Sequence, residues 1–131
     1  MRIYLDAAPV IYTVEKMEPY AAIVDARLAA VGVVRVASDL TRLECRVKPI
    51  QVGNAALLSD FDEYIAGNVS EIVPLTRAVM DRATDIRAQY GFKTPDSIHL
   101  AAASVAKCDV FLTNDHRLDR FTGIAVEIIE P

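Results

Sequence analysis

Short apolar runs alternate with longer amphipathic stretches along the whole chain. The apolar runs are rich in β-branched and aromatic residues and predict strands, whereas the amphipathic stretches predict helices. The expected strands cover 3–5, 33–37, 71–73, 109–113 and 125–129, and the expected helices cover about 8–16, 19–30, 39–48, 55–66, 76–90 and 94–103. Regular strand–helix alternation implies right-handed crossovers and a mainly parallel central sheet. The pattern therefore predicts an α/β protein with three layers, α/β/α.

Individual residues mark several of the helix ends. Thr76 is the expected N-cap of a helix that runs to about Tyr90 and is closed by Gly91. The segment Thr94–Asp96 is a strong helix start, because it offers a capping hydroxyl, a proline for the first turn and an acid facing the positive end of the helix dipole.

The composition indicates one well-packed domain spanning 1–131. Of the 131 residues, 53% are hydrophobic and 24% are charged, which supports a sizeable core and excludes a disordered protein. Cys45 and Cys108 have no further cysteine or histidine near them at zinc-ligand spacing, so we expect reduced thiols rather than a disulfide. The net charge of −4 argues against holding nucleic acid by bulk charge alone. It leaves open an acidic site that recruits cations.

No targeting or membrane segment is expected. Asp6 interrupts the N-terminal apolar run before a signal-peptide core can form. No apolar run approaches the ~18 residues of a membrane helix. We therefore expect a cytoplasmic protein.

Four acidic residues in separate segments are the best candidates for a functional site. Asp6 and Asp115 follow the first and fourth expected strands, and α/β proteins bind ligands at the carboxyl ends of their strands. Glu44 lies on the third expected helix and Asp96 in the first turn of the sixth. Taken singly, Asp6, Asp96 and Asp115 have structural alternatives, as a helix cap, a first-turn acid and a turn residue. Together they predict a site at one edge of the sheet.

Glu44 is the hardest of the four to explain structurally. Its helix carries Leu40, Leu43 and Val47 on one face, which we expect to be buried, before Pro49 interrupts the helix. A carboxylate at the border of a buried face usually has a partner or a metal ion.

The four acids need a counter-charge if they meet. Neighbouring carboxylates repel and raise one another's pKa unless something positive lies among them. Oxygen ligands without cysteine or histidine suit Mg²⁺ or Mn²⁺. Such an ion polarises a phosphoryl oxygen and activates bound water, so the acids predict phosphodiester hydrolysis.

Four segments resemble the motifs of PIN-domain ribonucleases, and the match is nearest to the VapC-type toxins of bacterial and archaeal toxin–antitoxin modules. The third segment is the most specific, and the four follow the family's order along essentially the whole chain. They are Ile3–Asp6, Thr41–Glu44, Thr94–Ala103 and Leu112–Asp115.

The resemblance implies a single PIN-like nuclease domain: an Mg²⁺- or Mn²⁺-dependent endoribonuclease that acts on RNA, forms a homodimer and is inhibited by a cognate VapB-type antitoxin. Its catalytic and metal-binding acids would be Asp6, Glu44, Asp96 and Asp115, with Thr113 and Asn114 beside them to orient a ligand or a water.

One position departs from the family pattern. Family members often carry Thr, Ser or Asn directly after the first aspartate, whereas this chain has Ala7. The missing hydroxyl implies weaker metal binding or compensation by Thr113.

Basic residues near the acids are candidate RNA contacts, with solvated surface charge or a subunit contact as the alternative for each. His99 lies one helical turn after Asp96, so it shares that face and either assists a leaving group or makes a structural hydrogen bond. The candidates are Arg42, Arg46, Lys48, Lys93, His99, Arg117 and Arg120.

Two other functions stay open. A phosphoacceptor receiver domain has similar length and architecture, but it needs paired acids after the first strand and a lysine after the last. Here Ala7 follows Asp6, and no lysine follows Lys107. The second alternative is a PIN fold kept as a non-catalytic interaction module, since the sequence does not show that the acids bind metal.

An additional apolar set is either ordinary core or a groove for a second subunit or an antitoxin. It comprises Tyr12, Ile23, Leu28, Leu57, Leu58 and Ile65.

Overall fold

Five strands and six α-helices alternate along the chain in the computed structural model, which describes residues 1–131. Every expected strand and helix is present, and a short 3₁₀ helix, η1, is added after the fourth strand. In chain order the elements are β1 (Arg2–Leu5), α1 (Ala7–Val14), α2 (Tyr20–Leu28), β2 (Val34–Ser38), α3 (Asp39–Gln51), α4 (Ala55–Asn68), β3 (Glu71–Val73), α5 (Arg77–Tyr90), α6 (Thr94–Val105), β4 (Val110–Thr113), η1 (His116–Arg120) and β5 (Ala125–Ile128).

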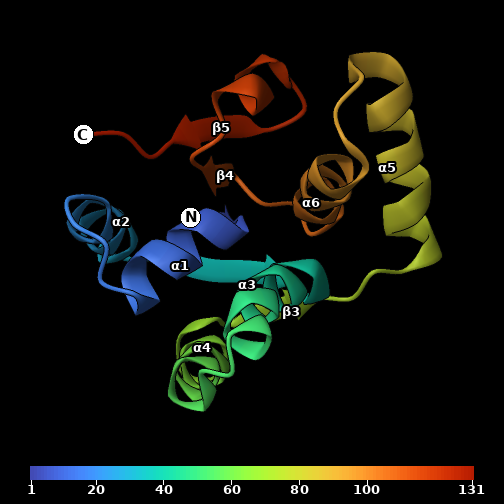
Figure 1. Cartoon of the computed structure of the whole chain (residues 1–131). Coiled ribbons are helices and arrows are strands. Elements are labelled where there is room, and N and C mark those ends of the chain that lie inside the picture. The colour runs from blue at the N-terminus through green and yellow to red at the C-terminus, as the bar shows by residue number, and fades with distance from the viewer.

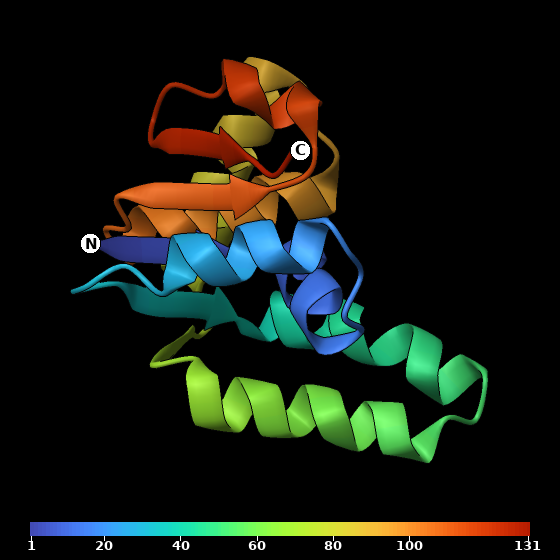
Figure 2. The ribbon, with the colours of Figure 1, turned by 90° about the vertical axis from the view of Figure 1, so that its left-hand side faces the viewer.

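The sheet has the strand order β3-β2-β1-β4-β5, and every pair is parallel. β1 is the central strand, with Tyr4 opposite Val36 of β2 on one side and Phe111 of β4 on the other. Figure 2 shows the arrows of β2, β4 and β5 pointing to the same edge of the molecule. All carboxyl ends therefore lie at one edge, as the strand–helix alternation predicts.

Side chains of β1 alternate between two cores, one on each face of the sheet. Tyr4 belongs to the core formed with α5 and α6, whereas Ile3 and Leu5 belong to the core formed with α1, α2 and α4. Figure 1 shows α5 and α6 on the side of the sheet opposite α1 and α2. The three-layer α/β/α prediction is confirmed.

α3 buries a different face from the one we expected. Leu43 and Val47 are 56% and 43% exposed, and the buried row is instead Thr41, Cys45 and Pro49. These three positions are four residues apart and face β1 and α1, where the Thr41 hydroxyl donates to the Leu5 carbonyl at 3.0 Å. The helix also continues past the proline to Gln51 rather than ending before it.

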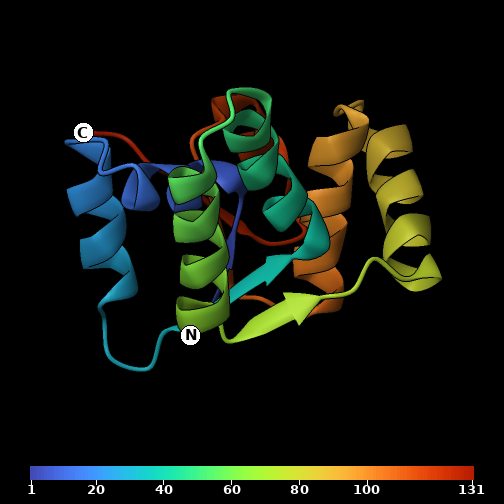
Figure 3. The ribbon, with the colours of Figure 1, turned by 60° about the horizontal axis from the view of Figure 1, so that its bottom comes forward.

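α5 and α6 form an antiparallel pair, visible at one side of Figure 3. The Thr76 hydroxyl accepts from the Val79 amide and caps α5, and Gly91 ends that helix with a φ of 74°, as predicted. The N-cap of α6 is Lys93, with no side-chain hydrogen bond, so the expected capping by Thr94 is wrong.

The additional apolar set is mostly core. Leu28 and Ile65 are buried, and Tyr12, Ile23 and Leu57 pack against the core on the α1 face. Both cysteines are free thiols. None of the helices has the length and apolar character needed to cross a lipid bilayer.

Candidate active site

Asp6 and Thr113 lie side by side at the carboxyl ends of β1 and β4. The Asp6 amide donates to the Leu112 carbonyl at 3.1 Å, which continues the strand pairing beyond β1. The buried Thr113 hydroxyl then donates to Asp6 Oδ2 at 2.7 Å. Asp6 Oδ1 accepts from the Ala7 amide, so Asp6 also caps α1. Thr113 thus gives Asp6 a hydroxyl partner where Ala7 has none to offer.

Glu44 reaches the same place from α3, through His99 of α6. His99 Nε2 is hydrogen-bonded to Glu44 Oε1 and lies 3.4 Å from Asp6 Oδ1. One ligand atom from each of Asp6, Glu44 and His99 falls within 4.8 Å of the others. Three segments far apart in sequence therefore meet at one point of the sheet edge.

His99 is 1% exposed, which favours the structural hydrogen-bonding alternative over a direct RNA contact. Burial lowers the pKa of this imidazole, but the hydrogen bond with Glu44 and the negative charge of Asp6 outweigh burial. The pKa of His99 therefore stands above its ordinary value of 6.5.

Asp96 is half-buried in the first turn of α6 and belongs to the same charge cluster. Its pKa is raised above 3.8, first by burial and then by the negative charges of Asp6 and Asp115, while Arg117 and His99 oppose the shift. The negative charges around Asp96 are thus only partly neutralised by the protein's own cations. That imbalance is what a bound cation would relieve.

Asp115 already has a cation of its own. Arg117 donates from Nε at 3.0 Å and from Nη2 at 2.6 Å to the two carboxylate oxygens. These hydrogen bonds hold the pKa of Asp115 below its ordinary value, despite its partial burial. Asp115 therefore enters the site as half of an ion pair rather than as a free ligand.

Three other candidates, Asn114, Arg42 and Arg46, have partners outside the four acids. The Asn114 side chain donates to the Tyr12 hydroxyl at 2.9 Å and makes no hydrogen bond to the acidic residues. Arg46 pairs with Asp62 at 2.9 Å, and Arg42 lies 4.0 Å from the same carboxylate, so both are engaged between α3 and α4. These contacts favour the structural alternative for both arginines.

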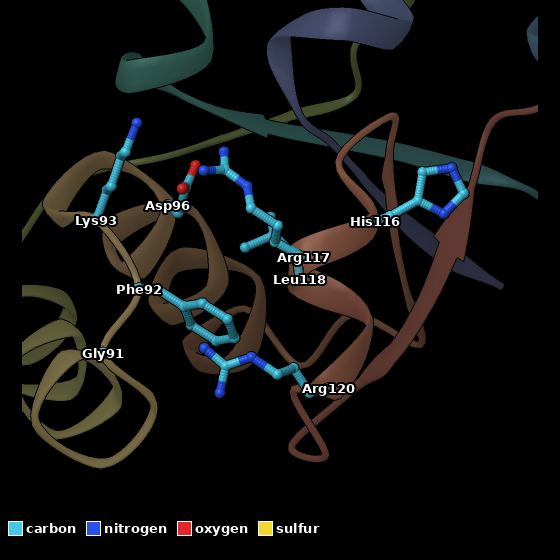
Figure 4. A pocket seen from close by; sticks show the side chains of 8 residues that line it. All are labelled: Gly91, Phe92, Lys93, Asp96, His116, Arg117, Leu118 and Arg120. Atoms are coloured by element: carbon cyan, nitrogen blue, oxygen red, sulfur yellow. The ribbon is translucent and has the colours of Figure 1, made fainter.

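A pocket of about 350 Å³ opens beside Asp96, between the start of α6 and η1. Figure 4 shows the Asp96 carboxylate and the Arg117 guanidinium pointing toward one another, with Lys93 above them and Arg120 beneath the Phe92 ring. The Arg120 guanidinium lies 4.6 Å from the centre of that ring. The pocket is thus lined by Asp96 and by three cations, Lys93, Arg117 and Arg120.

The sequence reasoning missed one set of residues behind the site. The Tyr4 hydroxyl is hydrogen-bonded to Ser38 and to His99, and Thr41 lies 3.5 Å away. All four side chains are buried. The available signal was the polar Ser38 ending a strand of β-branched residues, but nothing local connects it to His99.

The residues present fit a hard divalent cation. Asp6 and Glu44 offer carboxylate oxygens around His99, and burial together with the negative charges of Asp6 and Asp115 raises the pKa of Asp96 beside them. Asp6, Glu44 and Asp96 are the residues that would hold the ion.

The sequence matches the PIN domain family over residues 3–124. No curated protein sequence matches it. Among solved structures, VapBC2 of Rickettsia felis, bound to a DNA fragment from its promoter, superposes with a TM-score of 0.82 at 14% identity, covering 99% of this chain and 100% of that chain. A toxin–antitoxin complex from Klebsiella pneumoniae gives 0.70 at 18% identity, covering 94% and 95%. VapC20 of Mycobacterium tuberculosis, a toxin that cleaves the sarcin–ricin loop, gives 0.73 at 10% identity, covering 94% and 98%.

Proposed function

The chain belongs to the PIN-domain family, and on that basis we propose that it is an Mg²⁺- or Mn²⁺-dependent endoribonuclease, the toxin of a type II toxin–antitoxin pair. One observation carries the proposal: Asp6 and Glu44 meet around His99 at the carboxyl edge of the sheet. The negative charge of Asp6 also contributes to the raised pKa of Asp96. Membership of this family also removes the receiver-domain alternative.

The protein's own groups prepare the acids for this chemistry. Thr113 orients Asp6, and His99 holds Glu44. Asp6, Glu44 and Asp96 would hold a divalent ion, whose chemistry there would be to polarise the scissile phosphate and to activate a water. Asp96, whose pKa is raised by burial and by neighbouring negative charges, would gain a compensating positive charge from that ion.

RNA approaches the acids, in this proposal, from the pocket beside Asp96. Lys93 is exposed and makes no ion pair, so its ammonium group is free for a phosphate. Arg117 is 63% exposed and can exchange its pairing with Asp115 for a phosphate oxygen. This basic rim gives an acidic protein a local attraction for the RNA backbone.

A protein partner is part of the proposal, because toxin–antitoxin assemblies share this fold. α3 leaves a strip of apolar side chains in solvent, in which Ile50 is 58% exposed and Val52, just after the helix, 65%. Exposed apolar surface of this kind is typical of protein interfaces. We propose a VapB-type antitoxin and a second copy of the chain as partners in the cytoplasm.

The decisive experiment is cleavage of candidate RNAs by the purified protein with Mg²⁺, with Mn²⁺ and with EDTA. Asp6→Asn and Asp96→Asn are tested beside Asp81→Asn, a matched control at an exposed acid of α5. We expect metal-dependent cleavage by the wild type and the control, and none by the other two variants. Equal activity in all samples would remove the acids from the reaction. Absence of cleavage and of metal binding would favour a non-catalytic interaction module instead.

A further inference from the structure

A buried chain of hydrogen-bonded side chains leads from the protein core to two carboxylates of the site. The Tyr4 hydroxyl lies 2.8 Å from Ser38 Oγ and 2.8 Å from His99 Nδ1. The opposite ring nitrogen, Nε2, is hydrogen-bonded to Glu44 and lies 3.4 Å from Asp6 Oδ1. The residues that form this chain, Tyr4, Ser38 and His99, are at most 1% exposed.

Packing alone does not explain these polar groups. The Tyr4 ring stacks on Phe111 with 5.3 Å between ring centres and 9° between planes, and a phenylalanine would make the same contact. Burial of a hydroxyl and an imidazole is costly, so each must keep its partner. At one end Ser38 caps α3, and at the other end the chain reaches carboxylates at the sheet edge. The arrangement therefore indicates that the buried polar groups have a function at those carboxylates.

Glu44 is the group that needs support. It projects from a helix on a flexible side chain that is 32% exposed, so without a partner its carboxylate would rotate freely into solvent. His99 can hold it only if the imidazole ring itself is fixed. The bond from Nδ1 to Tyr4 sets the rotation of the ring and leaves Nε2 aimed at Glu44.

We propose that Tyr4 and His99 are positioning residues that hold the Glu44 carboxylate in the geometry required for metal binding and RNA cleavage. This inference rests on the proposed function, because it assigns a task at the same site. It adds a tyrosine that touches neither the metal nor the RNA, reached only through the imidazole.

Tyr4→Phe tests the chain by removing a single oxygen atom. We expect the substitution to lower the Mn²⁺ affinity or the kcat on a cleaved RNA roughly 10–100-fold, with little change in KM. Electron paramagnetic resonance titration measures the Mn²⁺ affinity. Tyr64→Phe is the matched control, because its hydroxyl also contacts a polar side chain, Arg35, on the other face of the sheet. Folding is checked by thermal unfolding. A folded Tyr4→Phe variant with wild-type Mn²⁺ affinity and wild-type kcat would overturn the proposal.

Two substitutions of His99 separate positioning from packing. A glutamine amide extends about as far as Nε2 and can still donate to Glu44, whereas an asparagine amide extends only as far as Nδ1. We expect His99→Gln to retain more Mn²⁺ affinity than His99→Asn, because only the glutamine amide reaches Glu44, but less than the wild type, because it loses the bond to Tyr4. Equal loss in both folded variants would mean that His99 acts only by filling space.

The proposed function and this inference fail in different ways. Wild-type protein that binds no Mn²⁺ and cleaves no RNA defeats the proposed function. Wild-type protein that does both, together with a Tyr4→Phe variant that does both equally well, defeats only the positioning of Glu44.

Discussion

Thr113 Oγ1 lies 2.7 Å from Asp6 Oδ2 and joins two residues that are 107 positions apart in the chain. The contact follows from the strand register, because Leu5 pairs with Leu112, and the next residues are Asp6, just after β1, and Thr113, the last residue of β4. The same hydroxyl accepts from the Asp115 amide at 3.1 Å. One buried oxygen therefore organises two of the four candidate acids.

Thr113→Val should lower metal affinity or cleavage about 10–100-fold, because it removes the hydroxyl that orients Asp6 and keeps the side-chain shape. The Asp115 amide also loses its acceptor, so unfolding should become easier by about 1–3 kcal/mol. Mn²⁺ titration and urea denaturation measure the two effects. Thr84→Val, on the exposed face of α5, is the control. Unchanged metal affinity in Thr113→Val would show that Asp6 needs no such orientation.

Asp96→Asn should raise the melting temperature of the metal-free protein at pH 7. Burial and the charges of Asp6 and Asp115 raise the pKa of Asp96 on folding, so its stabilising contribution is present below 3.8 and lost as the pH rises through the folded value. The neutral asparagine amide avoids that loss of stability, and the stability advantage of the variant over the wild type should shrink as the pH falls. Thermal unfolding in EDTA as a function of pH measures it. In saturating Mn²⁺ the order should reverse, because only the wild type gains binding energy, about 2.7 kcal/mol at 100 times Kd.

Arg117→Gln should make the protein less stable at neutral pH but not in acid. Arg117 lowers the pKa of Asp115, so the stabilisation exists above 3.8 and is lost as the pH falls through the lowered folded value. Melting temperatures of variant and wild type should therefore converge at low pH. A gap that persists in acid would mean that Arg117 stabilises the fold by packing.

The same variant should also bind RNA more weakly. If Arg117 contacts a phosphate, the slope of log binding constant against log salt concentration should become less steep by about one unit. Fluorescence anisotropy at several salt concentrations measures this slope. Arg77→Gln, at an exposed position of α5, should leave the slope unchanged.

Gly91→Ala and Gly67→Ala should have opposite effects on stability. Gly91 ends α5 with a φ of 74°, where an alanine costs about 1–2 kcal/mol, although no atom would touch its Cβ. Gly67 lies within α4 in open space, so alanine there should stabilise by about 0.5 kcal/mol. Urea denaturation of both variants checks the pair. A stabilising Gly91→Ala would contradict the left-handed conformation.

The strands and their carboxyl edge could be predicted because those signals are local. Buried parallel strands appear as continuous apolar runs, and the acid after such a run must lie at the sheet edge. This reasoning places Asp6 after β1 and Asp115 after β4. The buried face of α3 could not be predicted in the same way, because two rows of side chains on this helix compete for burial. Leu43 and Val47 are more apolar, but the row through Thr41 and Cys45 is the one small enough to pack against β1 and α1.

Interactions between distant residues were beyond sequence reasoning. His99 was recognised as sharing a face with Asp96, but its partner Tyr4 is 95 positions away and looks like ordinary core. The pairing of Arg117 with Asp115 spans only two residues, yet it depends on the turn into η1, which no periodicity announces. The predicted N-cap of α6, Thr94, lies one residue after the observed N-cap, Lys93. The sequence does not reveal Lys93 as a cap, because its side chain makes no capping hydrogen bond.

β1 precedes the other four strands in the chain and is the central strand of the finished sheet. Its second neighbour, β4, brings Thr113 and follows three other strands in chain order. A partly synthesised polypeptide thus contains Asp6 but none of the groups that flank it from β4. The part of the site that Asp6 shares with Thr113 therefore forms only after β4 has been made and has paired with β1.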